Sequence, residues 1–317
     1  MSSNIIIVSS ARDEHIPFVT KFLDKRKIIR IDPLDILIGK DISYKNNKGE
    51  IAFIYEGKLL NNILSIWYRH PTPLSWEELP VKDTVKDYSF SSLLSHIQML
   101  FGCFPEALWI SNIAAIERSK NKPLQQEYAY HCGLKVPKTL YTSSPLLAKD
   151  FINKLGICIA KSQANIFPEK KLNFTKIITT KDKLEFNGLR YDPYIFQEYI
   201  EPSAEIRVAV VGNKAFASII HGKEVDGVSS TFRDWRYAHF NNTFKAEAFT
   251  LPKDISNKCI DLVRNFGLQF GAIDLILDKE RNYWFLEINP NGQWAFVDDF
   301  TVEEIGKAIA TLLVNGK

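Results

Sequence analysis

The strongest chemical signal in the chain comes from two apolar strands near the C-terminus. The segment 283–289, Tyr-Trp-Phe-Leu-Glu-Ile-Asn, places Glu287 and Asn289 two residues apart, and alternate residues of a strand share a face. The apolar run 270–278 precedes it and carries Asp274, with a short polar stretch between the two runs that predicts a hairpin loop. If Asp278 pairs with Tyr283, Asp274 lies directly opposite Glu287.

These three oxygen-bearing side chains predict a magnesium site. Like charges placed opposite each other destabilise a sheet unless a cation lies between them. Carboxylate and amide oxygens suit Mg²⁺ whose coordination is completed by water and phosphate. We therefore expect Asp274, Glu287 and Asn289 to form the Mg²⁺ floor of a nucleotide site. The alternative is an edge hairpin with acidic residues at solvent-facing positions, which is the more usual explanation of any single carboxylate.

Two other segments carry side chains suited to a phosphate or a ribose. Lys161 ends the apolar strand 157–160 and can reach a phosphate as a flexible point charge, although strand-end lysines usually only extend toward solvent. Glu205 and Arg207 share a face of a later strand, where the arginine could hold a transferring phosphoryl group and the carboxylate could accept bonds from ribose hydroxyls. An exposed face with an ion pair between these two residues is an equally good explanation.

The segment 194–200 begins as an apolar strand and then turns polar. Backbone groups at such a transition can pair with the edge of a purine. We expect this hinge, formed by Gln197, Glu198, Tyr199 and Ile200, to contact the base of a nucleotide.

Composition restricts the class of protein. A chain of 317 residues is long for one core and favours two or three packed subdomains. With 45% apolar and 24% charged residues it is an ordinary globular protein, and a net charge of +3 gives no basic stripe for nucleic acid. No apolar run can span a bilayer, and the N-terminus lacks a signal peptide. Four scattered cysteines predict reduced thiols in the cytoplasm.

Hydrophobic periodicity predicts an α/β chain of the α+β kind in three parts. Residues 1–110 form a small α/β domain, residues 111–222 a linker helix and a strand-rich central lobe, and residues 223–317 a C-terminal lobe. The main expected elements are strands at 4–9, 28–31, 63–68, 135–141, 157–161, 174–180, 194–200, 206–211 and 214–220, a hairpin at 51–60, and helices at 15–27, 88–103, 114–131, 145–155, 252–266 and 301–314. No Gly-x-Gly-x-x-Gly or Gly-x-x-x-x-Gly-Lys-Ser/Thr motif is present.

Taken in chain order, these residues resemble the ATP-grasp carboxylate–amine ligases. The resemblance covers residues from about 110 to the end and implies the ATP-grasp fold, with ATP and Mg²⁺ as cofactors. It assigns residues 197–200 as the hinge and Asp274, Glu287 and Asn289 as the metal ligands. It also implies that two lysines, Lys122 and Lys161, bind phosphate. Glu205 becomes the ribose carboxylate and Arg207 the triphosphate arginine.

Within that superfamily the chain is similar to the microviridin or graspetide synthetases, which crosslink ribosomally made peptides. The segment 287–294, Glu-Ile-Asn-Pro-Asn-Gly-Gln-Trp, has their Gly-Gln-Trp extension, and 231–237, Thr-Phe-Arg-Asp-Trp-Arg-Tyr, resembles their Asp-x-Arg motif. The opening 5–32, with Trp67-Tyr68-Arg69, is similar to their MvdD-like pre-ATP-grasp domain. The single Arg69, followed by His70, departs from the paired arginines of such ligases.

The resemblance implies a reaction. ATP phosphorylates a side-chain carboxylate of a precursor peptide, and a Ser or Thr hydroxyl or a Lys amine attacks the acyl phosphate. Asp234 is then the expected general base, and Arg236 is expected to grip the substrate carboxylate. A surface loop with a local ion pair is the alternative for these two residues. The expected partner is a ribosomally made peptide with a leader and an acidic core, which lysines 170, 171, 176, 181 and 183 could attract.

Three functional hypotheses stay open at this point. The first is the peptide macrocyclase, the second a ligase that acts on free amino acids or a protein terminus, and the third a catalytically inactive peptide-binding protein. Neither a nucleic acid nor a membrane is expected as a partner. A homodimer is possible, with the apolar segment 101–109 as a candidate interface. The sequence does not choose between an ester and an amide crosslink.

Overall fold

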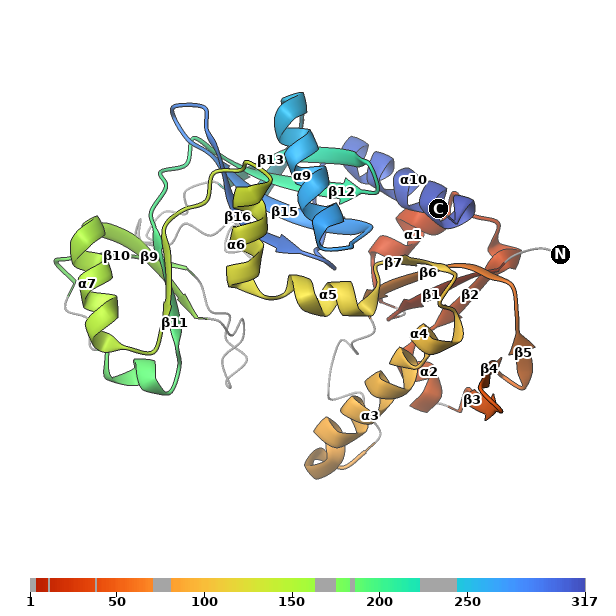
Figure 1. Ribbon diagram of the computed structural model, residues 1–317. Coiled ribbons are helices and arrows are strands. Elements are labelled where there is room, and N and C mark those ends of the chain that lie inside the picture. The colour runs from red at the N-terminus through yellow and green to blue at the C-terminus, as the bar shows by residue number, and fades with distance from the viewer. Residues whose placement is uncertain are drawn as a thin grey trace.

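The structure of the chain is a computed structural model of residues 1–317 (Figure 1). It describes residues 4–10, 12–37, 39–70, 81–162, 175–182, 186–222 and 244–316. These residues form three parts: an N-terminal α/β domain, a small central lobe that lies apart at one end, and a C-terminal lobe between them (Figure 1).

The N-terminal domain is built on a parallel sheet with the strand order β2-β1-β6-β7. A continuous apolar sequence forms β1 because its side chains are buried on both faces. Its strands are β1 (Asn4–Ser9), β2 (Ile28–Ile31), β6 (Ile63–His70) and β7 (Leu108–Ile110), and its helices are α1 (His15–Thr20), α2 (Pro33–Leu37), α3 (Lys86–Gln98) and α4 (Leu100–Cys103). A separate antiparallel sheet contains β3 (Ile42–Asn47), β4 (Glu50–Tyr55) and β5 (Lys58–Leu60). The predicted βαβ opening and the hairpin are confirmed.

Two short helices, α5 (Ile113–Ser119) and α6 (Lys122–His131), connect this domain to the central lobe. The single helix expected at 114–131 is therefore wrong. The Asn121 side chain accepts a hydrogen bond from Leu124 N and caps α6, and Pro123 lies in its first turn. Proline has no N–H to donate to the preceding turn and fits only the first turn of a helix, so the chain starts a new helix here, with the extended Asn121 as its N-cap.

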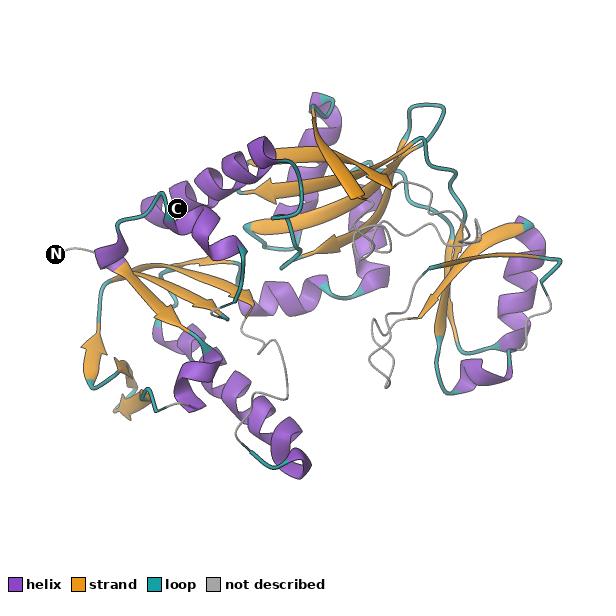
Figure 2. Ribbon diagram, turned by 180° about the vertical axis from the view of Figure 1, so that it is seen from behind, coloured by secondary structure: helices purple, strands orange, loops and turns teal. Residues whose placement is uncertain are grey.

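The central lobe is an antiparallel sheet covered by one helix. Its strand order is β10-β9-β11-β8, and a small core of its own lies between the sheet and α7. The elements are β8 (Thr139–Thr142), α7 (Pro145–Leu155), β9 (Ile157–Ser162), β10 (Lys176–Thr179) and β11 (Tyr194–Glu198). Figure 2 shows the lobe as a separate layer of strands and helix.

The C-terminal lobe contains a five-stranded antiparallel sheet in the order β14-β13-β12-β15-β16. Its elements are β12 (Ala204–Val211), β13 (Lys214–Gly222), β14 (Phe244–Phe249), α9 (Lys253–Asn265), β15 (Phe270–Leu277), β16 (Tyr283–Asn289) and α10 (Asp299–Asn315). β12 and β13 lie within the range 111–222 expected to form the linker and central lobe. Both strands belong instead to the same sheet as β15 and β16, because β12 pairs with β15 along its whole length.

Two helices cover opposite faces of this sheet. Ile206 and Val208 of β12 pack in the core that includes α9, while Ala209 and Val211 pack in the core that includes α10 and Trp294. α10 also contacts the N-terminal domain, where the Ser65 hydroxyl donates to the Leu313 carbonyl across 2.7 Å. The N-terminal domain and the C-terminal lobe thus share one core.

The contact between α10 and α1 is close because of a glycine. A Cβ at Gly306 would lie 2.4 Å from the Phe18 carbonyl oxygen, a backbone atom that cannot move away alone. The apolar segment 101–109 also belongs partly to the interior. Trp109 is 6% exposed in β7, so its predicted exposure is wrong, whereas Phe101 is half-exposed.

Candidate nucleotide and metal site

Asp274 and Glu287 face each other across β15 and β16. The residues nearest the hairpin turn pair as Leu277 with Tyr283, so the predicted pairing of Asp278 with Tyr283 is wrong. The register then shifts between Asp274 and Leu275, because Leu286 is an extra residue in β16. This bulge brings Glu287 opposite Asp274, as the sequence predicts, and Asn289 lies opposite Ala272 on the same face.

Each of these carboxylates has a basic partner from another element. Arg207 Nη1 of β12 lies 2.6 Å from Asp274 Oδ1, and both side chains are largely buried. Lys122 Nζ of α6 lies 2.6 Å from Glu287 Oε2, and both of these side chains are about one-third exposed. The structure therefore brings together four of the predicted site residues, two acidic and two basic.

A glutamine from α6 holds the strand that carries two of the predicted ligands. β16 is the edge strand of its sheet, so a side chain can pair with its outer backbone groups. Gln125 Nε2 donates to the Ile288 carbonyl across 2.8 Å, and its Oε1 accepts from Ile288 N across 3.2 Å. Gln125 is 1% exposed, and Ile288 lies between Glu287 and Asn289. The amide thus fixes the edge strand where the oxygen ligands project.

Residues 289–295, which begin at the last residue of β16, fold back over Arg207. We call these residues the Gly-Gln-Trp segment. Arg207 Nη2 donates to the Gln293 carbonyl across 2.8 Å. A Cβ at Gly292 would lie 2.5 Å from Ala272 Cβ and 2.7 Å from Arg207 Nη2, so only glycine permits this approach. Asn289 Oδ1 accepts from Asn291 N across 3.0 Å and closes the turn.

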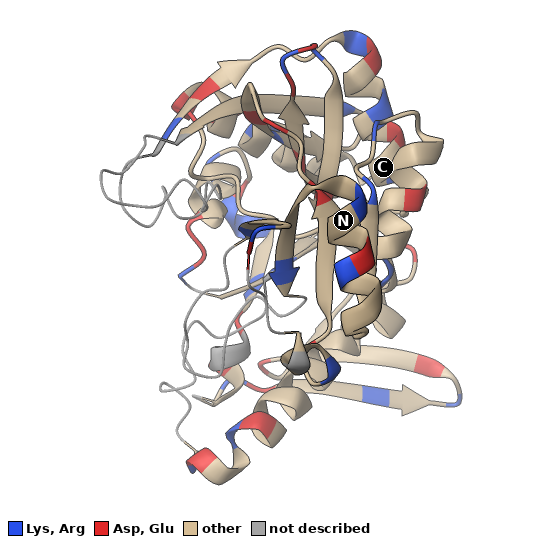
Figure 3. Cartoon of the chain, turned by 90° about the vertical axis from the view of Figure 1, so that its left-hand side faces the viewer, with Lys and Arg blue, Asp and Glu red and all other residues tan. Residues whose placement is uncertain are grey.

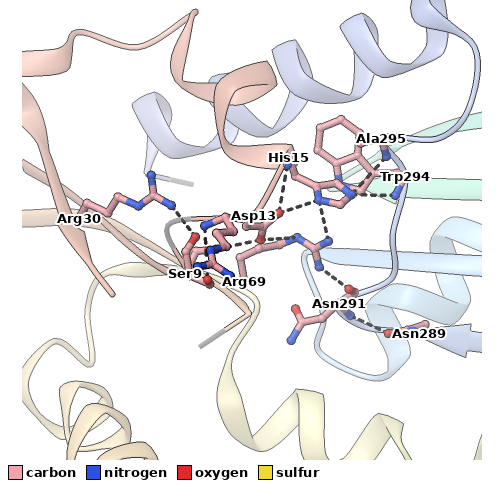
Figure 4. Close-up of polar contacts among 11 residues, drawn as sticks. Ser9, Asp13, His15, Arg30, Arg69, Asn289, Asn291, Trp294 and Ala295 are labelled. Carbon is pink, nitrogen blue, oxygen red and sulfur yellow. Dashed lines mark hydrogen bonds and ion pairs between the residues drawn. The ribbon is translucent and has the colours of Figure 1, made fainter. Parts of the chain in front are cut away.

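The N-terminal domain contacts this segment through two buried polar side chains, His15 and Arg69, and Asp13 lies behind both of them (Figure 4). His15 Nε2 accepts hydrogen bonds from Trp294 N across 3.0 Å and from Ala295 N across 3.2 Å. His15 Nδ1 lies 2.7 Å from Asp13 Oδ1. Arg69 Nη1 donates to the Asn291 carbonyl, and Arg69 Nε lies 3.6 Å from Asp13 Oδ2.

The charges in this cluster are consistent with an ionised Asp13 and a neutral His15. Burial lowers the pKa of His15, and this outweighs the hydrogen bond to Asp13, which raises it. Burial raises the pKa of Asp13, but the hydrogen bond from His15 and the charge of Arg69 together hold it well below its usual range. Burial lowers the pKa of Arg69 to about 10, so its guanidinium remains charged at neutral pH.

The remaining predicted residues lie on or beside the central lobe. Lys161 of β9 pairs in register with Ile195 of β11, next to the predicted hinge. Gln197 is buried and donates to Thr139 Oγ1 across 2.9 Å, so it contacts another strand of its own sheet. Its side chain is therefore not available to a purine, although the prediction for the hinge concerned backbone groups. Tyr199, Ile200 and Glu205 are half-buried along the connection to β12 and at its start.

Two predicted catalytic residues, Asp234 and Arg236, lie outside the described residues. The same is true of the rest of the Asp-x-Arg motif and of lysines 170, 171 and 183. Their predicted roles stay predictions.

The donor set fits Mg²⁺. Two opposed carboxylates and a carboxamide offer hard oxygens on one face and leave other coordination positions to water and phosphate. Arg207 and Lys122 add positive charge beside them, as a polyphosphate requires. In the view of Figure 3, basic and acidic residues lie interspersed along the strands and helices.

A family model for the RimK-like ATP-grasp domain matches residues 119–313. The chain belongs to this family. ATP-grasp enzymes use ATP and Mg²⁺, so the predicted ATP-grasp fold, ligase family and cofactors are confirmed. The matched range includes α6, the central lobe and the C-terminal lobe, and leaves out the N-terminal domain.

Solved structures of ATP-grasp ligases resemble the chain over its whole length, including the N-terminal domain. A RiPP-associated ATP-grasp ligase of Chryseobacterium gregarium, in complex with ADP and a leader and core peptide, is 26% identical with a TM-score of 0.87, over 100% of this chain and 98% of that one. The macrocyclase MdnC of Microcystis aeruginosa MRC, bound with the precursor peptide MdnA, is 26% identical with a TM-score of 0.80, over 99% and 100%.

A curated relative is matched over a shorter stretch. The probable alpha-L-glutamate ligase of Parasynechococcus marenigrum is 25% identical over 66% of this chain and 44% of its own length. The chain thus spans less than half the length of the curated relatives it matches. No helix within the described ranges is long and apolar enough to cross a membrane.

The residues that hold the site from outside are not predicted by the local sequence pattern. Gln125 sits in a helix where a glutamine is unremarkable, and its partner is 163 residues away. Asp13 lies just before α1 and His15 is the first residue of that helix, and Asp13 accepts from His15 N, as capping residues often do. The one available signal was Arg69, a charged residue that continues the apolar strand β6.

We predict that Gln125→Leu destabilises the edge of the sheet. The variant keeps the volume of the side chain but leaves the buried N–H and C=O of Ile288 without a partner, which costs about 2 kcal/mol or more. Denaturant unfolding gives the loss in free energy of unfolding, and hydrogen exchange gives the loss of protection at the Ile288 amide. Gln126→Leu is the matched control, because the hydrogen bond of Gln126, across 2.7 Å, goes to the Thr139 side chain and not to the backbone of β16. Equal losses in the two variants would contradict the role of Gln125.

We also predict a pH dependence of stability that comes from His15. Its folded-state pKa is lowered, so the unfolded chain binds the proton first. The stabilisation is complete above the ordinary value of about 6.5 and is lost as pH falls from there toward the folded-state pKa. Free energies of unfolding measured between neutral pH and about pH 5 should therefore fall less steeply in His15→Gln than in the wild type. Parallel curves would show that His15 is not buried in its neutral form.

Proposed function

We propose that the protein is an ATP-dependent peptide macrocyclase. The terminal phosphoryl group of ATP passes to an Asp or Glu side-chain carboxylate of a ribosomal precursor peptide, and ADP leaves. A Ser or Thr hydroxyl or a Lys amine of the same peptide then attacks the acyl phosphate, loses its proton and expels phosphate. Each ring forms one ester or amide bond and removes one water from the peptide.

The observation that supports this proposal most is the opposition of Asp274 and Glu287 with Arg207 and Lys122 bound to them. Two carboxylates at one register of a sheet repel each other, and the structure offsets this with two basic side chains from other elements. This arrangement can exchange its partners, because Mg²⁺ can take the carboxylate oxygens while the basic groups turn to phosphate oxygens. A solvated edge hairpin has no need of such partners.

Each residue then has a proposed role. Asp274, Glu287 and Asn289 would hold Mg²⁺, which would supply positive charge to the transferring phosphoryl group. Lys122, Lys161 and Arg207 neutralise phosphate charge. The backbone of the hinge 197–200 receives the adenine, and Glu205 receives the ribose. Asp234 accepts the proton of the attacking group, and Arg236 binds the substrate carboxylate.

The proposed substrate is a precursor peptide with a leader and an acidic core. The Chryseobacterium gregarium relative is in complex with a leader and core peptide and the Microcystis aeruginosa relative with a precursor peptide, and the likeness to them includes the N-terminal domain. Lys176 and Lys181 are exposed on the central lobe and suit an acidic peptide. A homodimer and a cytoplasmic location stay predictions, the latter supported by four free cysteines.

A second candidate function is supported by the match to an alpha-L-glutamate ligase. An enzyme of that kind would join a free amino acid to a carboxylate, through the same nucleotide site. The two candidates differ in what they require, because a ligase for free amino acids releases ADP without any leader peptide.

We predict that Glu287→Gln abolishes macrocyclisation. Loss of several kcal/mol of charge stabilisation at the metal lowers the rate about a hundredfold or more. Intact-mass spectrometry of a candidate precursor incubated with the enzyme, Mg²⁺ and ATP counts rings as water losses. Glu280→Gln, in the exposed turn of the same hairpin, is the matched control and should cyclise the peptide as the wild type does.

Three results would decide against the macrocyclase. ADP release that depends on free amino acids and not on the peptide would favour the second candidate. Binding of the precursor without any ADP release would favour an inactive peptide-binding protein. Water losses that persist unchanged in Glu287→Gln would place the reaction outside the proposed metal site.

Asp234→Asn should separate the two half-reactions. The variant keeps the metal and phosphate residues, so the carboxylate is still activated and ADP is released, but the attacking group no longer loses its proton to the carboxylate. Ring closure should fall about a hundredfold or more, while added hydroxylamine traps the activated carboxylate as a hydroxamate detected by mass. Loss of the hydroxamate along with the rings would contradict the role of Asp234 as the base.

A further inference from the structure

The buried cluster of Asp13, His15 and Arg69 has no role in the reaction proposed above. All three belong to the N-terminal domain, and His15 and Arg69 are at most 1% exposed. Within the described part of the chain, the hydrogen bonds that His15 and Arg69 make outside their own domain go to the backbone of the Gly-Gln-Trp segment.

The contacts at Nε2 decide the protonation of His15. Two backbone N–H groups, of Trp294 and Ala295, point at Nε2, so this atom presents its lone pair and carries no proton. The proton of the neutral ring is then on Nδ1, from which it is donated to Asp13 Oδ1 across 2.7 Å, and the longer approach of Arg69 Nη2 to Nδ1, at 3.3 Å, is not a hydrogen bond in this tautomer. Asp13 thus selects the tautomer, as a carboxylate does behind a metal-bound histidine. The Ser9 hydroxyl donates to the other Asp13 oxygen across 2.8 Å and holds the carboxylate in turn.

The Gly-Gln-Trp segment connects this cluster to the nucleotide site. It begins at Asn289, a proposed metal ligand, and its Gln293 carbonyl accepts from Arg207, which binds Asp274. Two side chains of the N-terminal domain hold the segment on either side of Gln293. Arg69 binds the Asn291 carbonyl, and His15 binds Trp294 N and Ala295 N. A shift of the segment would therefore move the acceptor of Arg207 and the start of the turn at Asn289.

We propose that His15 is a positioning residue of the nucleotide site, and that Asp13 and Arg69 complete a clamp by which the N-terminal domain sets the affinity for Mg²⁺ and nucleotide. The proposal rests on the proposed roles of Asn289 and Arg207. His15 acts only through the backbone of the Gly-Gln-Trp segment. The clamp gives the N-terminal domain a part in nucleotide binding, although none of its side chains would touch the nucleotide.

A purely structural role is the competing explanation, because His15 also packs edge-on against Trp294 with ring centroids 4.9 Å apart. The two explanations differ in which atoms matter. Packing depends on the volume of the side chain, whereas the clamp depends on an acceptor at the position of Nε2. A glutamine at this position can place its Oε1 near the two N–H groups and keep the acceptor.

The experiment measures the equilibrium binding of ADP in the presence of Mg²⁺, by isothermal titration calorimetry on the full-length protein. Removal of groups that orient metal ligands commonly costs ten- to a hundredfold in affinity, so His15→Ala should weaken binding about tenfold or more. His15→Gln should restore most of the loss. Val19→Ala is the matched control. Val19 is a fully buried residue of the same helix and packs in the same core as Trp294, but its apolar side chain forms no hydrogen bond.

The outcomes separate the clamp from a structural role. Weak binding in His15→Ala, with near-normal binding in His15→Gln and Val19→Ala, supports the clamp. Equal weakening in His15→Ala and Val19→Ala, or no rescue by glutamine, overturns it. If His15→Ala does not fold, Asp13→Asn takes its place, since a neutral amide no longer selects the tautomer, and wild-type affinity in that variant would overturn the clamp.

Glu287→Gln in the same assay tests the proposed function independently. If it binds Mg²⁺ and ADP as the wild type does, the proposed metal site is wrong and the clamp has nothing to position. If it binds weakly while His15→Ala binds normally, the metal site stands and only the clamp is overturned.

Discussion

The stability of the C-terminal lobe depends on how it offsets the repulsion between two carboxylates that lie directly opposite each other in one sheet. Asp274 and Glu287 face each other on β15 and β16, where repulsion would otherwise favour a slip of the strands. Arg207 and Lys122 remove this repulsion, one from a neighbouring strand and one from the start of α6. Because a buried carboxylate that lost its partner would be strongly destabilising, Arg207 and Asp274 must be kept together or supplied with another partner at the same moment.

This constraint explains why so many distant elements meet at β16. An edge strand with an extra residue is prone to change its register, and here a bulge sets the position of Glu287. Gln125 pairs with the strand from outside like one residue of a further strand, and Lys122 lies three residues before it in the same helix. The Gly-Gln-Trp segment is held in turn by the N-terminal domain. The domain that the family model leaves out is therefore joined to the site through a shared core and a polar clamp.

The sequence predicts the parts of the site that depend on local pattern. The alternation of β16, the hairpin and the ends of α7 follow from residues close in the chain, and the resemblance to ATP-grasp ligases supplies the order of the site residues. The bulge at Leu286 is invisible to such a pattern, because it depends on which register satisfies Asp274, Arg207 and Lys122 together. The break before α6 does have a local signal, Pro123, which favours the first turn of a helix. Gln125 and His15 stand in ordinary sequence contexts. The backbone groups that they bind at the site, those of Ile288 and Trp294, are more than 160 residues away.

Under the proposed function the same basic groups would serve two states of the site, and this would link stability to activity. In the described structure Lys122 and Arg207 bind the carboxylates. A bound nucleotide with Mg²⁺ would bring both a cation for the carboxylates and an anion for the basic groups, so every charge would keep a partner of opposite sign. The exchange needs small movements of side chains and leaves the strands in place. It also requires the Arg207 guanidinium to keep its direction while its partner changes, and the Gln293 carbonyl, held by the clamp at its two sides, is the contact that fixes this direction.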